Sequence, residues 1–244
     1  MLSFLKNHPF AVESFFESSV VLTFAVEKEK LQQHIPERLQ LDTLNDKCAF
    51  LAVAMVQTKD LRPKGFPRFM GNDFFLMGYR VFVRYTNKAG RKLRGLYILR
   101  SETDKGRMVF LGNVFTHYNY SKIDIVRSDT ENYSMIRSVK SGFAVRLDSG
   151  ATEVALPEDS PFKDWKEARR FAGPLPFTFT CDAATGKVLI VEGVRENWTP
   201  APIRVIDQHF QYLQSLKLGD YVLANAFIIR NIPYFWKKGK IESW

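Results

Sequence analysis

The sequence has few cysteines, no long apolar run and no common metal or nucleotide motif, and each shortage excludes a class of protein. Only two cysteines occur in 244 residues, Cys48 and Cys181, and each lies within an apolar run typical of a strand. Their spacing fits no metal motif, and a reduced thiol in such a run behaves as a small hydrophobic side chain. A cytoplasmic location is therefore the simplest interpretation.

Membrane spans and export signals are also missing. The longest charge-free run is 108–121, well short of the roughly 20 apolar residues that a membrane span needs. The N-terminal segment Met1–Phe10 has no apolar core followed by a small-residue cleavage site. We therefore expect a soluble protein that is not exported.

Several catalytic signatures are absent as well. The sequence has no His or Cys pairs at ligand spacing, no acidic cluster, no phosphate-binding glycine loop and no Gly-x-Ser-x-Gly elbow. We therefore expect no metal and no cofactor. A Ser-His-Asp triad stays open, because its members need not be adjacent in sequence.

Basic residues exceed acidic ones, 35 against 26, which gives a formal net charge of +9. The basic residues are scattered singly or in pairs such as Arg169-Arg170, and they form no block or helix stripe. We expect neither nucleic acid nor a membrane as partner. The alternative, a basic module that binds nucleic acid or a membrane surface, predicts affinity that falls steeply with salt.

One segment stands out by its composition. Residues 108–121 (MVFLGNVFTHYNYS) carry no Lys, Arg, Asp or Glu, but they include one His, two Asn and two Tyr between charged flanks. Buried polar side chains need hydrogen-bond partners, so such a mixture is typical of a segment that lines a pocket. This segment is the first place to look for a site.

Most of the chain alternates apolar and polar residues with a period of two, which is typical of strands. The turns 87–90 and 182–186 each join two such runs and predict antiparallel hairpins. Helical pattern is confined to four short segments: 27–34, 104–111 ending at Gly112, 164–171, and 206–216. About nine strands are predicted, at 19–26, 48–56, 73–85, 91–101, 123–127, 142–147, 176–181, 187–194 and 221–229.

Many strands and few helices favour a closed barrel, which removes exposed sheet edges. In 73–85 one face is apolar throughout, while the other mixes apolar residues with Arg80 and Arg84. A barrel lumen that holds a ligand would have such a mixed face. The alternative is an antiparallel sheet with one solvated face and both arginines in water.

The next predicted strand places Arg100 and Glu102 on one face and Tyr97 on the other. Strict alternation would let Arg80, Arg100 and Glu102 meet. In a low-dielectric interior such a group could orient an anionic substrate or exchange a proton. The alternative is a set of surface ion pairs of small energetic weight.

Two stretches resemble a known family. Residues 95–104 (GLYILRSETD), with a short helix, Gly112 and a Tyr-rich strand after them, are similar to the DUF2071 family, as is the ending from Ala224 to Gly239. That family resembles acetoacetate decarboxylase in fold. The resemblance spans roughly residues 10–240 and implies a mainly β (α+β) chain, 1–244, folded as one domain. The implied domain is a closed antiparallel cone-shaped β-barrel with a few short peripheral helices and an internal cavity, and a homo-oligomeric assembly.

The resemblance does not extend to the catalytic residues. In the decarboxylase one of two adjacent lysines forms a Schiff base with a β-keto acid, activated by the second cation. Here the matching stretch is Tyr118-Asn119-Tyr120-Ser121, and the nearest amine is Lys122, which shares the strand parity of Tyr120. The pattern Glu-x-Asn-x-Arg of the decarboxylase corresponds to residues 76–80 (LMGYR), which keep only Arg80.

His117 is the remaining titratable group of the uncharged segment, with an ordinary pKa near 6.5 that suits proton transfer around neutral pH. A histidine bonded only to backbone groups is the alternative. The candidate catalytic residues are His117, Glu102 and Lys122. The candidate ligand-binding residues are Arg80, Arg100, Tyr97, Tyr118, Asn119 and Tyr120.

We therefore expect a barrel that binds a small anionic or carbonyl-bearing organic molecule in its interior. One hypothesis is an enzyme related to the decarboxylase but without its lysine, working by acid-base or hydrolytic chemistry. The other is a non-enzymatic binding or sensing protein that retains the cavity.

Overall fold

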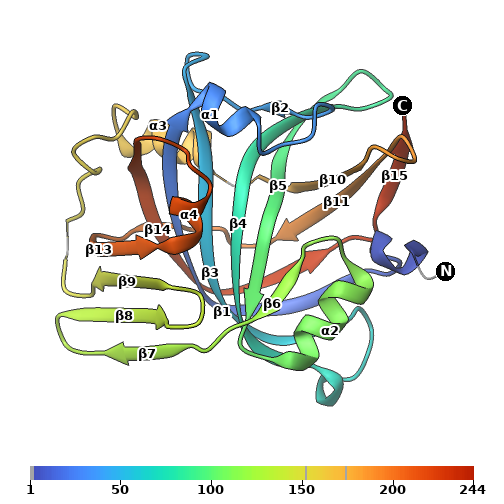
Figure 1. The fold of residues 1–244 in the computed structure, drawn as a ribbon. Coiled ribbons are helices and arrows are strands. Elements are labelled where there is room, and N and C mark those ends of the chain that lie inside the picture. Colours follow the sequence, from blue (N-terminus) through green and yellow to red (C-terminus); the bar gives the residue numbers. More distant parts are fainter. Residues whose placement is uncertain (1–2, 152, 174) are drawn as a thin grey trace.

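The computed structural model describes residues 3–151, 153–173 and 175–244 (Figure 1). Of the N-terminal segment Met1–Phe10, the first two residues lie outside this description. Fifteen strands and four short α-helices make up the regular structure of the described ranges, so the chain is mainly β as expected.

The larger sheet has eleven strands. Nine of them follow one another in hydrogen-bonded order: β12 (Ala201–Pro202), β14 (Tyr221–Trp236), β1 (Val12–Glu27), β3 (Cys48–Pro63), β4 (Asn72–Thr86), β5 (Lys92–Thr103), β10 (Phe177–Asp182), β11 (Lys187–Arg195) and β15 (Lys240–Ser243). The short strands β2 (Gln40–Leu41) and β6 (Tyr120–Lys122) pair with β4 and β5. In addition, β11 pairs with β14 through Gly193–Arg195.

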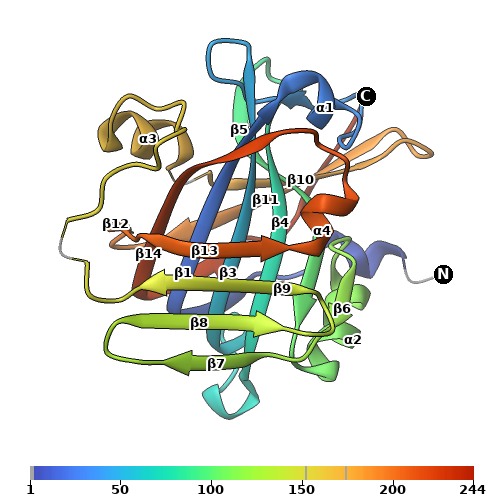
Figure 2. The same ribbon diagram turned by 60° about the vertical axis from the view of Figure 1, so that its left-hand side comes forward.

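A second sheet of four strands lies across strands of the first (Figure 2). Its order is β13 (Val205–Phe210), β9 (Phe143–Asp148), β8 (Tyr133–Ser138) and β7 (Val126–Asp129). The largest apolar cluster joins the two sheets, with Leu22, Tyr79 and Val81 on one side and Val145 and Phe210 on the other. Burying this cluster is the main stabilising contribution at this face.

The helices are short and lie around the larger sheet. They are α1 (Lys28–Gln32), α2 (Gly106–Phe115), α3 (Trp165–Ala172) and α4 (Gln211–Ser215), with the 3-10 turns η1 (Ser3–Asn7) and η2 (Arg68–Met70). Helix α3 is capped by Asp164, whose side chain accepts from the Glu167 N–H at 2.7 Å. Glu167 in turn accepts from the Lys163 N–H at 2.8 Å, just before the cap. No helix within the described ranges is long and apolar enough to cross a membrane.

Both predicted hairpins are confirmed. Strands β4 and β5 pair antiparallel around the turn 87–90, and β10 and β11 pair antiparallel around 182–186. The expectation of an antiparallel sheet throughout is wrong, because β5 pairs parallel with both β6 and β10. A chain that leaves β5 through α2 and returns beside it runs in the same direction, as in other crossover connections.

Three element predictions need correction. The predicted helix 206–216 is strand β13 as far as Phe210, whose side chain packs in the inter-sheet core, and only Gln211–Ser215 is helical. The predicted strand 123–127 begins only at Val126. Helix α2 continues through Gly112 to Phe115. Gly112 is not a helix-ending residue here, and its lack of a side chain instead makes room for the Tyr120 ring.

The pairing of β4 with β5 contains a bulge that decides which residues share a face. Tyr79 pairs with Arg100 and Arg80 pairs with Ile98, so Leu99 is left without a partner. One extra residue reverses the alternation beyond it. Ile98 therefore lies on the face of Arg80, whereas Arg100 lies on the opposite face.

Candidate functional site

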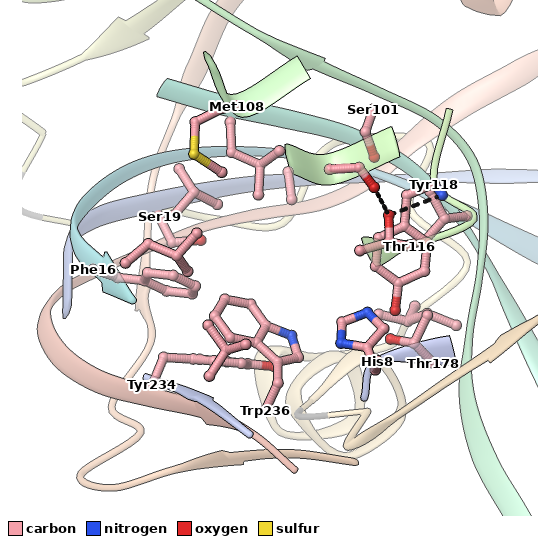
Figure 3. A pocket seen from close by; sticks show the side chains of 18 of the residues that line it. His8, Phe16, Ser19, Ser101, Met108, Thr116, Tyr118, Thr178, Tyr234 and Trp236 are labelled. Atoms are coloured by element: carbon pink, nitrogen blue, oxygen red, sulfur yellow. Dashed lines mark hydrogen bonds between the residues drawn. The ribbon is translucent and has the colours of Figure 1, made fainter. Parts of the chain in front are cut away.

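A cavity of about 500 Å³ lies on the Arg80 face of the larger sheet, opposite the inter-sheet core. Figure 3 shows part of its wall. Strands of the larger sheet, helix α2 and the N-terminal arm 8–10 contribute side chains to its wall. Most of them are apolar: Phe16, Val21, Ala52, Ala54, Val56, Phe74, Leu76, Phe82, Leu96, Ile98, Met108, Leu111 and Phe115. A volume of several hundred Å³ with apolar walls and a few polar groups is typical of a small-molecule site.

Arg80 is a charged residue in this wall, on β4. Its Nε is buried without a hydrogen-bond partner. Burial lowers the pKa of the guanidinium, and the nearby phenol of Tyr234 opposes the shift, but an arginine remains charged in proteins. Its guanidinium lies above Gly78 of the same strand, where an added Cβ would come 3.0 Å from Nε. The glycine therefore makes room for the arginine.

Arg195, at the end of β11, is a second arginine of the wall. Its Nη2 donates to the Leu175 carbonyl at 3.0 Å, and its guanidinium lies 4.3 Å from the Trp198 ring centroid and 5.5 Å from that of Tyr234. Burial also lowers the pKa of this guanidinium.

Within the described part of the chain, no carboxylate and no lysine lines the cavity. Arg62 and Arg107 also line the cavity, but Arg62 is paired with Glu13 and Asp60, and Arg107 is exposed. Arg80 and Arg195 have no carboxylate partner among the described residues of the wall, so they give the interior an uncompensated positive charge.

Sequence reasoning missed Arg195. The strand predicted at 187–194 ends one residue before it, so the predicted alternation stops short of this side chain. Extending the predicted strand by one residue, to Arg195, would have placed this side chain on the same face as Gly193, two residues earlier. An added Cβ at Gly193 would contact the Tyr234 hydroxyl. That signal is present in the sequence but is weak, because arginines at strand ends are usually solvated.

The uncharged segment 108–121 does line the cavity, as predicted from its composition. Tyr120 is held by Asn113, whose side chain donates to the Tyr120 carbonyl at 2.9 Å and accepts from its N–H at 2.8 Å. The ring packs on Gly112, where a Cβ would come 2.3 Å from the ring. Burial raises the pKa of Tyr120 to about 12. The phenol therefore stays protonated and can donate a hydrogen bond toward an anion.

Tyr118 reaches the cavity from the turn after α2. Its backbone N–H donates to the Thr116 hydroxyl at 3.2 Å, and that hydroxyl donates to the Gly112 carbonyl at 2.8 Å (Figure 3). The side chain is buried, and its hydroxyl has no partner at hydrogen-bond geometry. Burial raises the pKa of the phenol, and the neighbouring Thr178 side chain opposes the shift. Two of the predicted ligand-binding tyrosines, Tyr118 and Tyr120, thus share the cavity with Arg80.

His8 is a residue of the wall that the sequence analysis does not single out. It lies in the N-terminal arm with a φ of 48°, in the left-handed region. Its side chain is buried, and its ring centroid lies 5.5 Å from that of Tyr118. Burial, with a smaller contribution from His117, lowers the pKa of His8 to about 4. No sequence signal marks this residue, because a terminal arm has no periodicity that would predict where it packs.

Six of the nine predicted site residues lie outside the cavity wall, and three of them come from the segment around β6. His117 is half-buried, and its Nε2 lies 3.3 Å from Asn7 Oδ1 in the N-terminal arm. Burial lowers its pKa. Lys122 is exposed at the end of β6, and Asn119 is exposed with a φ of 52°, as the turn between α2 and β6 requires. Their predicted roles stay predictions, but the structure does not bring them to the cavity.

The expectation that Arg80, Arg100 and Glu102 meet is wrong. The bulge at Leu99 turns Arg100 and Glu102 to the inter-sheet side, together with Tyr79. There the Arg100 Nη2 lies 2.6 Å from Glu102 Oε1, and Ser141 donates to Oε2 at 2.6 Å. The Glu102 carboxyl is fully buried, and burial raises its pKa.

Tyr97 also lies away from the cavity wall, half-buried against the inter-sheet cluster. Burial raises the pKa of its phenol. Tyr97 pairs with Val81 on β4 and precedes the bulge in the chain. Its side chain therefore lies on the face that strict alternation predicts. That face is the core side of the sheet and not the cavity side.

The sequence profile of the DUF2071 family, described as "uncharacterized conserved protein", matches residues 16–226. The chain belongs to the DUF2071 family. This match confirms the family resemblance predicted from residues 95–104 and 224–239. In this DUF2071 protein the cavity extends beyond the matched range, because His8 precedes it and Tyr234 and Trp236 follow it.

Solved structures with the same fold are acetoacetate decarboxylases and similar enzymes. Acetoacetate decarboxylase from Legionella pneumophila superposes with a TM-score of 0.66 at 10% identity, over 97% of this chain and 89% of that one. An acetoacetate decarboxylase-like enzyme from Sphingomonas wittichii gives 0.58 at 11% identity, over 97% and 93%. The enduracididine biosynthesis enzyme MppR gives 0.56 at 9% identity, over 96% and 88%.

At such low identity these similarities establish the fold of the DUF2071 protein and nothing about its activity. A comparison with curated protein sequences finds no match. The fold is therefore acetoacetate decarboxylase-like, as the sequence resemblance implied, and function has to be argued from the cavity.

Proposed function

We propose that this protein binds a small organic anion with an apolar body, without a covalent bond, in the cavity beside Arg80. The proposal rests on two half-buried arginines whose guanidinium groups are desolvated, Arg80 and Arg195. They lie in a largely apolar wall that holds no carboxylate among the described residues. A buried cation without a counter-ion is costly, and a bound carboxylate would supply the missing partner.

The pairing of β11 with β14 supports an enclosed site. Strands β14, β1, β3, β4, β5, β10 and β11 are each paired with the next, and the β11–β14 pairs Gly193–Trp236 and Arg195–Tyr234 return to the first. We propose that these strands form a closed barrel with the cavity as its lumen. Wall residues from His8 to Trp236 favour one domain over the whole chain.

Binding, and not catalysis by the predicted acid-base residues, is the function that this geometry favours. Glu102 and His117 lie outside the cavity wall, and Glu102 is engaged by Arg100 and Ser141. Arg80 and Arg195 can form charge-assisted hydrogen bonds to a carboxylate, and the Tyr120 phenol can add a third donor. Such groups recognise an anion without having to exchange a proton with it.

The proposal is tested by calorimetric titration with 3-phenylpropanoate and its neutral counterpart 3-phenylpropanamide. We expect the acid to bind and the amide to bind at least tenfold more weakly. The Arg80→Gln variant should lose about 2 kcal/mol of binding free energy for the acid, roughly 30-fold, because a desolvated charge pair loses one partner.

The matched control is Arg91→Gln, which removes the same charge from the exposed turn between β4 and β5. This variant should bind the acid like the unmodified protein. Equal losses in the two variants would mean that net charge alone attracts the acid. Equal affinity for acid and amide in the unmodified protein would refute the proposed function.

A further inference from the structure

The N-terminal arm forms part of the cavity wall, and it is fixed there at His8. The His8 N–H donates to the Phe115 carbonyl at the end of α2, with 3.3 Å between the atoms. The His8 carbonyl accepts from the Gly239 N–H near the other end of the chain, at 2.8 Å. Both bonds use only the backbone. They leave the imidazole free to contact what the cavity holds.

Two side chains of the wall, His8 and Tyr118, are each more than nine-tenths buried, with exposed fractions of 8% and 7%. Neither the His8 Nε2 nor the Tyr118 hydroxyl has a partner at hydrogen-bond geometry. Burial raises the pKa of the Tyr118 hydroxyl, and the side chain of Thr178, which lies beside it, opposes the shift (Figure 3). The two rings lie 5.5 Å apart and point into the same part of the cavity (Figure 3). Buried polar atoms are rarely left unpaired, because each such atom loses its bonds to water.

The chemistry of the pair indicates what would complete it. The lowered pKa keeps the His8 imidazole neutral at physiological pH, so its Nε2 either accepts or donates according to the tautomer. The Tyr118 hydroxyl can do both. A hydroxyl group placed between them donates one hydrogen bond and accepts another, and therefore satisfies the pair in either tautomer.

We propose that His8 and Tyr118 form a hydroxyl subsite, so that the protein binds hydroxylated organic acids in preference to the same acids without the hydroxyl. This inference rests on the proposed function, because Arg80 and Arg195 hold the acid group. The hydroxyl subsite would select among the acids that the arginines accept. Polar pairs of this kind discriminate strongly, since an analogue that lacks the hydroxyl leaves both atoms unpaired.

The test compares 3-phenylpropanoate with its three ring-hydroxylated isomers, carrying the hydroxyl at carbon 2, 3 or 4 of the ring. Calorimetry gives the preference ratio, the affinity of each isomer divided by that of the parent acid. We expect one isomer to bind about tenfold more tightly than the parent, as a gain of two hydrogen bonds allows. In Tyr118→Phe, which removes one oxygen, that ratio should fall to about one.

A matched control is Tyr221→Phe, which removes a phenol oxygen from β14 on the inter-sheet side. It should keep the preference ratio of the unmodified protein. His8→Ala is the second variant and should also bring the ratio to about one. The thermal unfolding midpoint is recorded for each variant, and the ratio is read from whichever of the two folds like the unmodified protein.

The outcomes separate the two proposals. If the parent acid binds but no isomer binds more tightly, water alone completes the His8–Tyr118 pair and the hydroxyl subsite is wrong. The hydroxyl subsite is equally wrong if the ratio survives both Tyr118→Phe and His8→Ala. If neither the parent acid nor any isomer binds, the proposed function itself fails, and the hydroxyl subsite fails with it.

Discussion

The guanidinium of Arg80 lies directly over Gly78, two residues earlier on β4, so that a Cβ at Gly78 would come 3.0 Å from Nε and 3.4 Å from Nη2. The contact is with the far end of a flexible side chain and not with backbone. Adding a methyl group there should therefore move the guanidinium and leave the strand intact.

Gly78→Ala should bind 3-phenylpropanoate about three- to tenfold more weakly, since the displaced Arg80 loses alignment with the acid. Its free energy of unfolding should be unchanged or slightly higher, because alanine is less flexible than glycine in the unfolded chain. Calorimetry and urea unfolding measure the two quantities. Gly106→Ala is the control, because the nearest atom to its Cβ would be Lys122 Cδ at 3.9 Å. An unaltered affinity in Gly78→Ala would mean that Arg80 does not contact the acid.

Arg80→Met should raise stability while it weakens binding of the acid to a similar extent as Arg80→Gln. The variant keeps an unbranched apolar stem and removes a buried cation that has no carboxylate partner in the described wall. We expect the free energy of unfolding to rise by about 1–3 kcal/mol in the absence of ligand. Urea unfolding checks this value. A loss of stability would show that the Arg80 charge is compensated within the protein.

His8 should make the protein less stable in acid. The folded-state pKa of about 4 lies below the ordinary value of 6.5. The unfolded chain therefore takes up the proton first, and stability is lost as pH falls from about 6.5 to about 4. Between pH 7 and pH 4.5 the contribution of this one group is about 2 kcal/mol.

Urea unfolding at the two pH values tests this in the His8→Asn variant, since asparagine tolerates a positive φ. The variant should lose less stability on acidification than the unmodified protein. His117, whose pKa is also lowered by burial, keeps part of the pH dependence. His209→Asn, at an exposed position of β13, should behave like the unmodified protein. If the unmodified protein and His8→Asn showed the same pH dependence of stability, the His8 side chain would be exposed to solvent and not buried.

The Ser141→Ala variant tests whether the buried Glu102 carboxyl on the inter-sheet side is independent of the cavity. The Ser141 hydroxyl donates to the fully buried Glu102 carboxylate at 2.6 Å on the inter-sheet side. Its removal should cost about 2 kcal/mol of stability, as for other hydrogen bonds to buried charged groups, and leave acid binding unchanged. Ser134→Ala, whose bond to Ser149 is exposed, should cost less than about 0.5 kcal/mol. Weaker acid binding in Ser141→Ala would show that Glu102 contributes to binding in the cavity.

The strands can be predicted because their sequences carry the period of two. The alternation over residues 73–85 predicts a strand, and these residues form β4, with Tyr79 and Val81 in the inter-sheet core and Phe82 on the other face. The turns at 87–90 and 182–186 are identifiable for the same local reason. Of the second sheet, the sequence predicts β9 and only the start of β7. Strand β13 is taken for a helix and β8 is missed, because β7 and β13 are short and largely exposed and carry little alternation.

The candidate site can be predicted only in part. Composition identifies the segment with Tyr118 and Tyr120, and the mixed face of β4 identifies Arg80. The partners assigned to Arg80 are wrong, because one unpaired residue, Leu99, reverses the alternation of β5. His8 is missed, because the packing of a terminal arm depends on tertiary structure, which no local pattern records. Arg195 is missed because the predicted strand 187–194 ends one residue before it, and arginines at strand ends are usually solvated.

The central claim is that the carboxylate of a bound acid lies at Arg80 and Arg195 inside the cavity. The most direct test is a crystal structure with 3-(4-bromophenyl)propanoate, in which anomalous scattering locates the bromine. We expect the bromine among the apolar side chains of the wall and the carboxylate within about 3 Å of the Arg80 or Arg195 guanidinium. An acid found on the outer surface, or inside the cavity with its carboxylate turned away from both arginines, would contradict the account.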